Sequence, residues 1–588
     1  MKIIRLKVEN FRGIKNCEII FSGHTALVGD NNTGKSTILE AIDLVLGPER
    51  MSRFPVIDEH DFYAGQYLNN NREIIEINIE VLIVDLTEEQ QRHFRNHIEW
   101  WNTNTNSLIE EPPPETTDAE GVLFALRLGF TGNYDEEEDN FVGKTFFLSP
   151  QKDDGTYELL STRDKRHCGF LFLRTLRTGA RALSLERGSL LDIILRLQDL
   201  QLHMWEDVLD KLRKLTVAEK KELGISDILT SIQEAVRSFV PSDWAENPHL
   251  RVSELTREHL RKVITVFMST GAVREDGSEY AAPFHHQGTG TINTLVLALL
   301  SMIAELKQNV IFAMEEPEIA IPPHTQKRII NSVTSKSAQA IFTSHSPFVL
   351  EEFNPKQIMV IKRDQGELTG IPAEYPPTVK PKKFREEFRR RFCEALLARR
   401  VLITEGRTEY DAIPVAAKKL NELDPNKNKT FDALGIAIIN AEGETQIAPL
   451  GKYFKDLGKT VFAVFDKQDE ENLKEIESTV DYSFEGPEKG FENVILNGTD
   501  EDILCKYALS IVQDDEWPPH LKSKTPTEEM SIEELKDSLK SYLGKTKGSG
   551  VAADILDFCT ADQMPDFIIE TIESIQKVVE SELEETLE

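Results

Sequence analysis

The feature of this 588-residue sequence that most limits its fold is a glycine-rich loop near the N-terminus. Its residues 29–36, GDNNTGKS, match the pattern G-x-x-x-x-G-K-[ST]. The apolar residues 25–28 precede the loop, and apolar residues at helical spacing follow it. In this pattern, backbone N–H groups surround phosphate oxygens, the lysine reaches the outer phosphates and the serine hydroxyl binds Mg²⁺. We therefore expect an α/β domain whose nucleotide site includes Gly29, Asn32, Gly34, Lys35, Ser36 and Thr37.

A second predicted strand carries the acidic residues that such a site needs. Residues 310–314 are five apolar residues in a row, which is typical of a buried parallel strand, and Glu315 and Glu316 follow them. We expect Glu315 to hold Mg²⁺ directly or through water, and Glu316 to polarise the attacking water. Most sites of this kind have Asp in the first of these positions, so Glu315 is a departure.

Two weaker signals extend the pattern. Residues 286–290, HQGTG, precede a predicted helix and resemble the signature loop of ABC-type ATPases. His345, in the run Thr-Ser-His, resembles the switch histidine of the same proteins. The N-terminal half thus resembles an ABC-type ATPase head of the kind found in chromosome-maintenance and DNA-repair proteins, without their long coiled coil. The resemblance implies ATP held between two heads, and hence a homodimer or higher homo-oligomer.

The C-terminal part contains a second group of acids at predicted strand ends. The apolar residues 401–403 lead into Thr404 and Glu405-Gly406, and Glu409 lies four residues after Glu405. The apolar run 461–465 ends in Asp466. This order of strand, carboxylate, glycine and helix resembles the opening of a Toprim domain. Carboxylate oxygens suit Mg²⁺ or Mn²⁺, and paired metal ions would support phosphodiester cleavage.

The acids after the second strand depart from the usual Toprim pattern, D-x-D. This chain has Asp466-Lys-Gln-Asp469, so Gln468 stands at the position of the second Asp. Asp469 is one residue out of register. Either Gln468 or Asp469 takes the role of the second acid, and we include Asp469 among the candidate metal ligands.

An ABC-type head followed by a Toprim domain resembles the OLD (overcoming lysogenization defect) family of nucleases over nearly the whole chain. Residues 172–191 also resemble the sequence before that family's helical dimerisation insert. The resemblance implies ATP hydrolysis, metal-dependent DNA cleavage and defence against phage. It also implies a metal ligand at Glu492 and a lysine that stabilises phosphate charge, for which Lys547 and Lys545 are both candidates. Family members act alone or with a partner, such as a helicase-like protein or a retron reverse transcriptase with its DNA.

We expect an α/β multidomain fold in which a helical insertion, serving dimerisation or packing on the head, interrupts the ATPase head. A linker with a basic helix then leads to a Toprim domain with helical additions. The expected boundaries are 1–184 and 249–363 for the head, 185–248 for the insertion, 364–399 for the linker and 400–588 for the Toprim domain.

The formal net charge of −32 repels nucleic acid at long range. DNA binding would therefore need a local basic groove or bound metal ions. The basic segment 382–400 would either hold the DNA backbone or act as a linker paired with its own glutamates. Five scattered cysteines without a C-x-x-C pair fit a reducing cytoplasm, and no apolar run approaches membrane-spanning length.

Two other functions remain open at this stage. One is a Toprim strand-transfer enzyme, a topoisomerase or primase; a topoisomerase would need a nucleophilic tyrosine, and spacing does not identify one. The other is an ATP-gated DNA-binding scaffold with an inactive Toprim centre, which the Gln468 departure favours.

Overall fold

The structure is a computed structural model. It separates into two compact units, Met1–Thr25 with Ser36–Ser344, and Ala26–Lys35 with His345–Glu588; each is described by itself. Lys547, the side chain of Lys545 and residues 382–388 of the predicted basic segment lie outside the described residues. The described residues are 1–48, 50, 55–109, 121–173, 184–186, 189–198, 200–214, 225–238, 256–306, 309–319, 321–376, 389–545 and 550–587.

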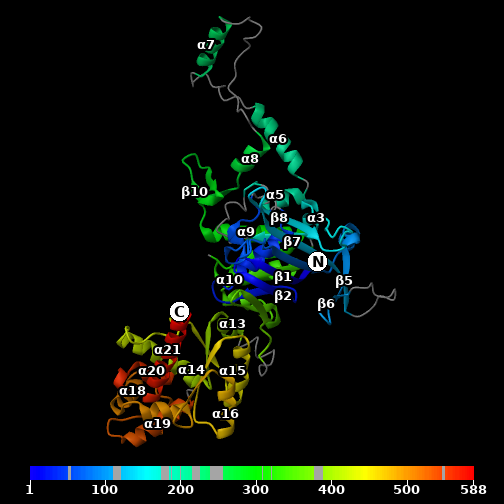
Figure 1. The fold of residues 1–588 in the computed structure, drawn as a ribbon. Helices are drawn as coiled ribbons and strands as arrows, with labels where there is room; N and C mark the ends of the chain where they lie inside the picture. Colours follow the sequence, from blue (N-terminus) through cyan, green and yellow to red (C-terminus); the bar gives the residue numbers. More distant parts are fainter. Residues whose placement is uncertain are drawn as a thin grey trace. The chain divides into compact units, whose positions relative to one another are not determined.

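The first unit contains an antiparallel layer with the strand order β6-β5-β7-β4-β1-β2. Figure 1 labels β1, β2, β5, β6 and β7 of this layer. Strand β8 pairs with β7 at the side of this path. The apolar side chains of its inner strands, such as Leu82 and Trp101, are fully buried. The strands are β1 (Lys2–Phe11), β2 (Ile14–Ile20), β4 (Ile77–Val84), β5 (Ile98–Asn102), β6 (Ser107–Ile109), β7 (Val122–Asp135) and β8 (Asn140–Phe147).

One of three neighbouring parallel strands in the same unit, β12, leads into the predicted acidic residues. Strand β12 (Ile311–Glu315) pairs with β9 (Phe170–Leu173) on one side and with β13 (Gln339–Thr343) on the other. Because β12 is central, its apolar residues are buried, as the five-residue run predicts. The helices that accompany these strands are α1 (Lys35–Leu46), α2 (Glu88–His93), α3 (Thr162–Cys168), α9 (Thr289–Leu306) and α10 (Pro323–Lys336).

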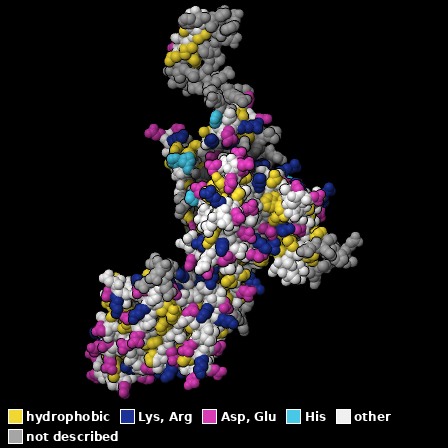
Figure 2. All heavy atoms as spheres, in the orientation of Figure 1, with side chains coloured by type: hydrophobic (Ala, Val, Ile, Leu, Met, Phe, Trp, Pro, Cys, Tyr) yellow, Lys and Arg dark blue, Asp and Glu magenta, His cyan; other side chains and the backbone are white. Residues whose placement is uncertain are grey.

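The predicted insertion is helical where the structure describes it. Trp205, Leu209 and Leu260 form a small core with Leu185. Helix α7 (Ile225–Arg237) instead exposes an apolar row, with Ile228 60%, Ile232 46% and Val236 41% exposed (Figure 2). The other described helices of the predicted insertion are α5 (Leu190–Leu197) and α6 (Gln201–Lys214). Beyond its predicted end at residue 248 lie α8 (Arg257–Val263) and the antiparallel pair β10 (Phe267–Val273) and β11 (Glu279–Pro283).

The second unit contains residues 29–35 of the glycine-rich loop, the predicted phosphate-binding loop, and a separate parallel sheet. Strand β3 (Thr25–Val28) pairs in parallel with β14 (Ile358–Asp364), which pairs with β15 (Glu367–Pro372), and α11 (Pro347–Leu350) lies in the same unit. The parallel sheet has the order β17-β16-β18-β19. Its strands are β16 (Arg400–Thr404), β17 (Ile436–Asn440), β18 (Thr460–Phe465) and β19 (Tyr482–Glu485).

All four strands of this sheet run parallel, so their carboxyl ends meet at one edge. Apolar side chains of the surrounding helices pack on the sheet in one continuous core. The α/β class with helical additions is confirmed. The helices are α13 (Arg389–Leu397), α14 (Arg407–Leu423), α15 (Ile447–Asp456), α16 (Glu470–Thr479), α17 (Phe491–Gly498), α18 (Glu501–Gln513), α19 (Ile532–Lys545), α20 (Val551–Asp557) and α21 (Asp566–Leu587).

Helix α13 packs its apolar face on α15 and is bonded at its C-terminus to Lys459, which directly precedes β18. Phe392 is fully buried and lies against the rings of Tyr453 and Phe454. The ammonium group of Lys459 donates hydrogen bonds to the carbonyls of Leu396 at 2.8 Å and Ala398 at 2.6 Å. These carbonyls lie at the helix end, where the last turn lacks intrahelical partners.

No helix in the described ranges is long and apolar enough to span a membrane.

Candidate functional site

The carboxyl ends of β16 and β18 bring two of the predicted acids together. Glu405 follows β16, and its Oε2 accepts a hydrogen bond from the backbone N–H of Asp466 at 3.2 Å. Asp466 follows β18, and its Oδ2 accepts from the N–H of Gly490 at 2.6 Å. Strands β16 and β18 pair in parallel, with Thr404 opposite Val464. The residues that follow them, Glu405 and Asp466, therefore lie beside each other.

Two further predicted acids lie at the same edge. Glu409, in the first turn of α14, is only 4% exposed. A Cβ at Gly406 would meet its Oε2 at 2.9 Å, so a glycine at this position makes room for the carboxylate. Glu492, in the first turn of α17, accepts from the hydroxyl of Thr408 at 3.3 Å.

These acids perturb one another's protonation. Burial and the neighbouring Asp466 charge raise the pKa of Glu405 to about 7. Burial, followed by the charges of Glu405 and Glu492, raises the pKa of Glu409 to about 7. A nearby divalent cation would favour the charged form of each group, and carboxylate oxygens are the ligands that Mg²⁺ and Mn²⁺ prefer. The chemistry of the donor atoms therefore suits such a cation, although no three of these side chains are arranged in the described chain to hold one ion.

The two candidates for the second acid have different surroundings. Asp469 is the N-cap of α16, where its side chain accepts from the backbone N–H of Asn472 at 2.9 Å. The amide of Gln468 instead points to the acids, donating to Glu405 Oε2 at 3.0 Å and to Asp466 Oδ1 at 3.1 Å. Its Oε1 is buried and has no hydrogen-bond partner among the described residues.

Among the described residues, no group of three or more His, Cys, Asp or Glu side chains is arranged so that it could hold a metal ion.

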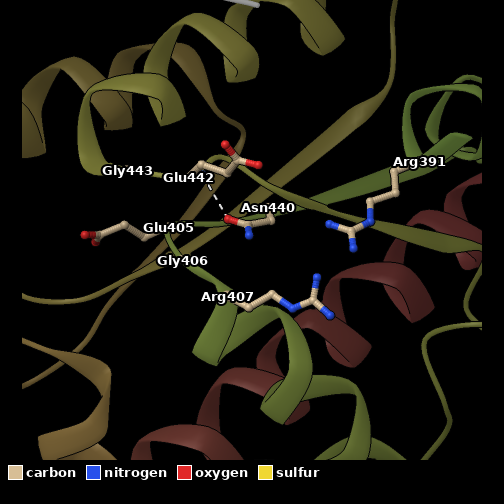
Figure 3. A pocket seen from close by; sticks show the side chains of 7 residues that line it. All are labelled: Arg391, Glu405, Gly406, Arg407, Asn440, Glu442 and Gly443. Atoms are coloured by element: carbon tan, nitrogen blue, oxygen red, sulfur yellow. Dashed lines mark hydrogen bonds between the residues drawn. The ribbon is translucent and has the colours of Figure 1, made fainter. Parts of the chain in front are cut away.

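A cavity of about 680 Å³ opens beside Glu405 (Figure 3). Sequence reasoning missed Asn440, Glu442 and Arg407 as parts of it. The signal that could have found the first two is the run Asn440-Ala-Glu-Gly443, because it repeats the order of strand, acid and glycine seen at Glu405-Gly406. The lining residues are Arg391, Glu405, Gly406, Arg407, Asn440, Glu442 and Gly443.

The phosphate-binding loop has the backbone conformation that its glycines allow. Gly29 has φ 150° and Gly34 φ 100°, and Asn32 also has a positive φ of 66°. A Cβ at Gly29 would lie 2.5 Å from the carbonyl oxygen of Ile361, so this position also requires glycine for space. The ammonium group of Lys35 is buried and donates to the carbonyls of Gly29 at 2.8 Å and Asp30 at 2.7 Å.

The hydroxyl-bearing residues after Lys35 face outward: Ser36 is exposed and Thr37 is half-buried. Both begin α1, so the first turn of this helix borders the loop. An anion at this place would meet the positive end of the helix dipole.

The predicted acids of the first unit stand at the carboxyl end of β12. Glu315 is its last residue. Glu316 has φ 46°, and its N–H donates to the carbonyl of Thr343 at 2.9 Å. Ser344 donates to Glu318 at 3.0 Å. His345 follows directly and begins the C-terminal segment of the second unit.

Two family models match the chain. The model described as "AAA ATPase domain" matches residues 1–147 and 186–350, more than half of the sequence. The model described as "Overcoming lysogenization defect protein-like, TOPRIM domain" matches residues 396–467.

Two curated relatives are similar over most of their length. The "OLD nuclease" of Thermus scotoductus is 24% identical over 485 residues, which are 75% of this chain and 78% of the relative. The "Old nuclease" of Escherichia phage P2 is 22% identical over 495 residues, 78% of this chain and 76% of the relative.

Solved structures also show likeness. An Smc head bound to the C-terminal winged-helix domain of ScpA is 13% identical, with a TM-score of 0.34, covering 63% of this chain and 97% of that one. The C-terminal region of the Burkholderia pseudomallei OLD protein is 18% identical, with a TM-score of 0.23, covering 31% of this chain and 98% of that one.

Proposed function

Because the chain belongs to the AAA ATPase domain family and carries an OLD-like Toprim domain after it, we propose that it is an ATP-hydrolysing, metal-dependent DNA endonuclease. The predicted ATPase head, Toprim domain and OLD-family membership are confirmed, and the chain is an ATPase-linked nuclease. The observation that carries the proposal is the hydrogen-bonded pair Glu405 and Asp466 at the ends of adjacent parallel strands.

The acids of this edge would hold the catalytic metal ions. Bound divalent ions would activate the attacking water and stabilise the leaving oxygen of the phosphodiester. Gln468 positions the first two carboxylates by donating to both, and its buried Oε1 faces no protein donor among the described residues. Lys547 stays our candidate for stabilising phosphate charge. The proposed metal-holding residues are Glu405, Glu409, Asp466 and Glu492.

The proposal is tested with supercoiled plasmid DNA. We expect conversion to nicked and linear forms with Mg²⁺ or Mn²⁺, and no conversion when EDTA removes the metal. Cleavage that persists in EDTA would contradict the metal requirement, and binding without cleavage under either metal would favour an inactive scaffold.

Exchanges at Gln468 and Asp469 separate metal binding from helix capping. Gln468→Asp adds a carboxylate, so we expect Mn²⁺ to bind about tenfold more tightly, because ligand charge sets the affinity of such sites. Asp469→Ala removes the α16 cap and is expected to cost about 1 kcal/mol of stability. It should leave Mn²⁺ affinity unchanged. Calorimetric titration with Mn²⁺ in the absence of DNA, together with melting curves, measures both effects.

The opposite result would place Asp469, rather than residue 468, at the metal site. If Asp469→Ala weakens Mn²⁺ binding and Gln468→Asp has no effect on it, Asp469 is the ligand.

We propose that the head binds ATP with Mg²⁺ through Lys35 and Ser36, supported by Gly29, Asn32, Gly34 and Thr37. The strand-end acids Glu315 and Glu316 would hold the metal and polarise water, and His345 would contact the outer phosphate. What supports this assignment is the match of the loop pattern together with its strand-to-helix context and positive φ angles.

The exposed apolar row of α7 supports self-association as a homodimer. Ile228, Ile232 and Val236 recur every four residues, so they form one stripe along the helix. The double variant Ile228→Asp, Ile232→Asp is expected to shift the molar mass in light scattering from dimer to monomer. Glu234→Lys, on the opposite side of the helix, is the control and should leave the mass unchanged. A wild-type chain that is monomeric at micromolar concentration would refute this dimer.

A further inference from the structure

The cavity beside Glu405 contains two cations whose role the acidic centre does not explain. Arg391 comes from α13 and Arg407 is the first residue of α14. Figure 3 shows their guanidinium groups on the side of the cavity away from the Glu405 carboxylate. The cavity therefore has an acidic side and a basic side.

Both arginines make cation–π contacts with the ring of Tyr410. The guanidinium carbon of Arg391 lies 4.4 Å from the centroid of the Tyr410 ring, and that of Arg407 lies 5.2 Å from it. The ring face attracts each cation. Like charges repel each other, so an anion that contacted both guanidinium groups would be favoured.

The ion pairs of the described residues leave these groups able to bind a further anion. Arg407 uses its Nε for Asp411 at 2.8 Å, one turn further along α14. Arg391 has no carboxylate partner within the described residues. Its neighbour Arg390 differs, because it pairs with Glu394 at 3.3 Å and lies over the ring of Phe348.

We propose that Arg391 and Arg407 form a subsite for a backbone phosphate of the nucleic-acid strand that the acids cleave. This inference rests on the proposed nuclease function and adds a second anchor to it. The planar guanidinium group donates paired hydrogen bonds to phosphate oxygens, so two of them can fix a phosphate in position. In a chain with a net charge of −32, such a local pair supplies the attraction that the whole molecule lacks.

The test measures DNA binding rather than cleavage. Fluorescence anisotropy in EDTA gives the affinity of the full-length protein for a short DNA duplex as salt is varied from about 50 to 200 mM. Arg391→Ala and Arg407→Ala are each expected to reduce the slope of log K against log salt by about 1. The loss should be the same for unrelated DNA sequences, because phosphate contacts carry no sequence information.

Arg390→Ala is the matched control, since it removes the same charge from the adjacent residue of α13. It should leave the slope unchanged. Arg407→Lys keeps the charge but loses the paired hydrogen bonds of the guanidinium group. Its slope should therefore stay near that of the wild type while its affinity for DNA falls. Melting curves of each variant confirm that it is folded.

Two results would overturn the subsite. One is an unchanged slope in both alanine variants. The other is an equal reduction of the slope in Arg390→Ala, which would indicate non-specific electrostatic attraction rather than a subsite. Either result leaves plasmid cleavage by the wild type intact, so it is distinguishable from failure of the nuclease proposal. Absence of DNA binding by the wild type in EDTA would also overturn the subsite.

Discussion

Glu405→Ala is expected to lower the rate of DNA cleavage by about 10³-fold or more, because it removes a central ligand of the proposed metal centre. Glu405 Oε2 also accepts the hydrogen bonds of Asp466 N and Gln468 Nε2, so its loss releases the groups that orient the second acid. The measurement is the initial rate of plasmid nicking in Mn²⁺ and in Mg²⁺. The variant should be folded, since it loses one of several mutually repelling carboxylates rather than a packing group.

Glu422→Gln is the control for this experiment. Glu422 lies on α14, is exposed and pairs only loosely with Lys418 at 3.8 Å, so cleavage should be unchanged. Equal cutting by Glu405→Ala and the wild type would refute the assigned centre. A covalent protein–DNA adduct in denaturing gels would favour a strand-transfer enzyme instead.

The same variant tests the defence against phage that the family resemblance implies. We propose that phage form fewer plaques on cells that express the wild type than on cells that express Glu405→Ala. Co-purification would reveal any defence partner, such as a helicase-like protein or a reverse transcriptase with its DNA.

Lys35→Ala is expected to reduce ATP hydrolysis by about 10²-fold or more, because it removes the cation that would meet the outer phosphates. Lys35 is buried and donates to two loop carbonyls. Residues 29–36 contain no other lysine that could supply an ammonium group. Phosphate release measures the effect. Lys15→Ala, on the exposed side of β2, is the control and should hydrolyse ATP normally.

Hydrolysis by Lys35→Ala at the wild-type rate would refute the assigned phosphate-binding loop. The variant also shows what ATP does for the nuclease. If it cleaves plasmid like the wild type without nucleotide but no longer responds to added ATP, nucleotide binding regulates cleavage rather than powering it.

The strand-end acids could be predicted from the sequence because their positions follow from local rules. A buried apolar run ends in a polar residue, and parallel strands end at one edge, so Glu405 and Asp466 lie at one edge if both strands belong to one sheet. That they are also close follows from the pairing of β16 with β18. The phosphate-binding loop was predictable for the same reason, since its function depends on the spacing of adjacent residues.

Residues that depend on strand order and side-chain bonding could not be predicted. Asn440 and Glu442 reach the cavity because β17 lies beside β16, which periodicity alone does not reveal. Gln468 and Asp469 are alternatives in the sequence, and only the folded chain shows that their side chains have different hydrogen-bond partners. The sequence does not distinguish Arg390 from its neighbour Arg391, yet of these two residues only Arg391 lines the cavity.

The attachment of α13 has a consequence for dividing this chain into fragments. The helix buries Phe392 against the rings of Tyr453 and Phe454 on α15, and Lys459 donates to its terminal carbonyls. A fragment beginning at residue 400 would expose the rings of Tyr453 and Phe454 to solvent and leave the ammonium group of Lys459 without its acceptors. A C-terminal fragment should therefore begin before Arg389, so that it includes α13 and keeps the apolar contacts of Phe392.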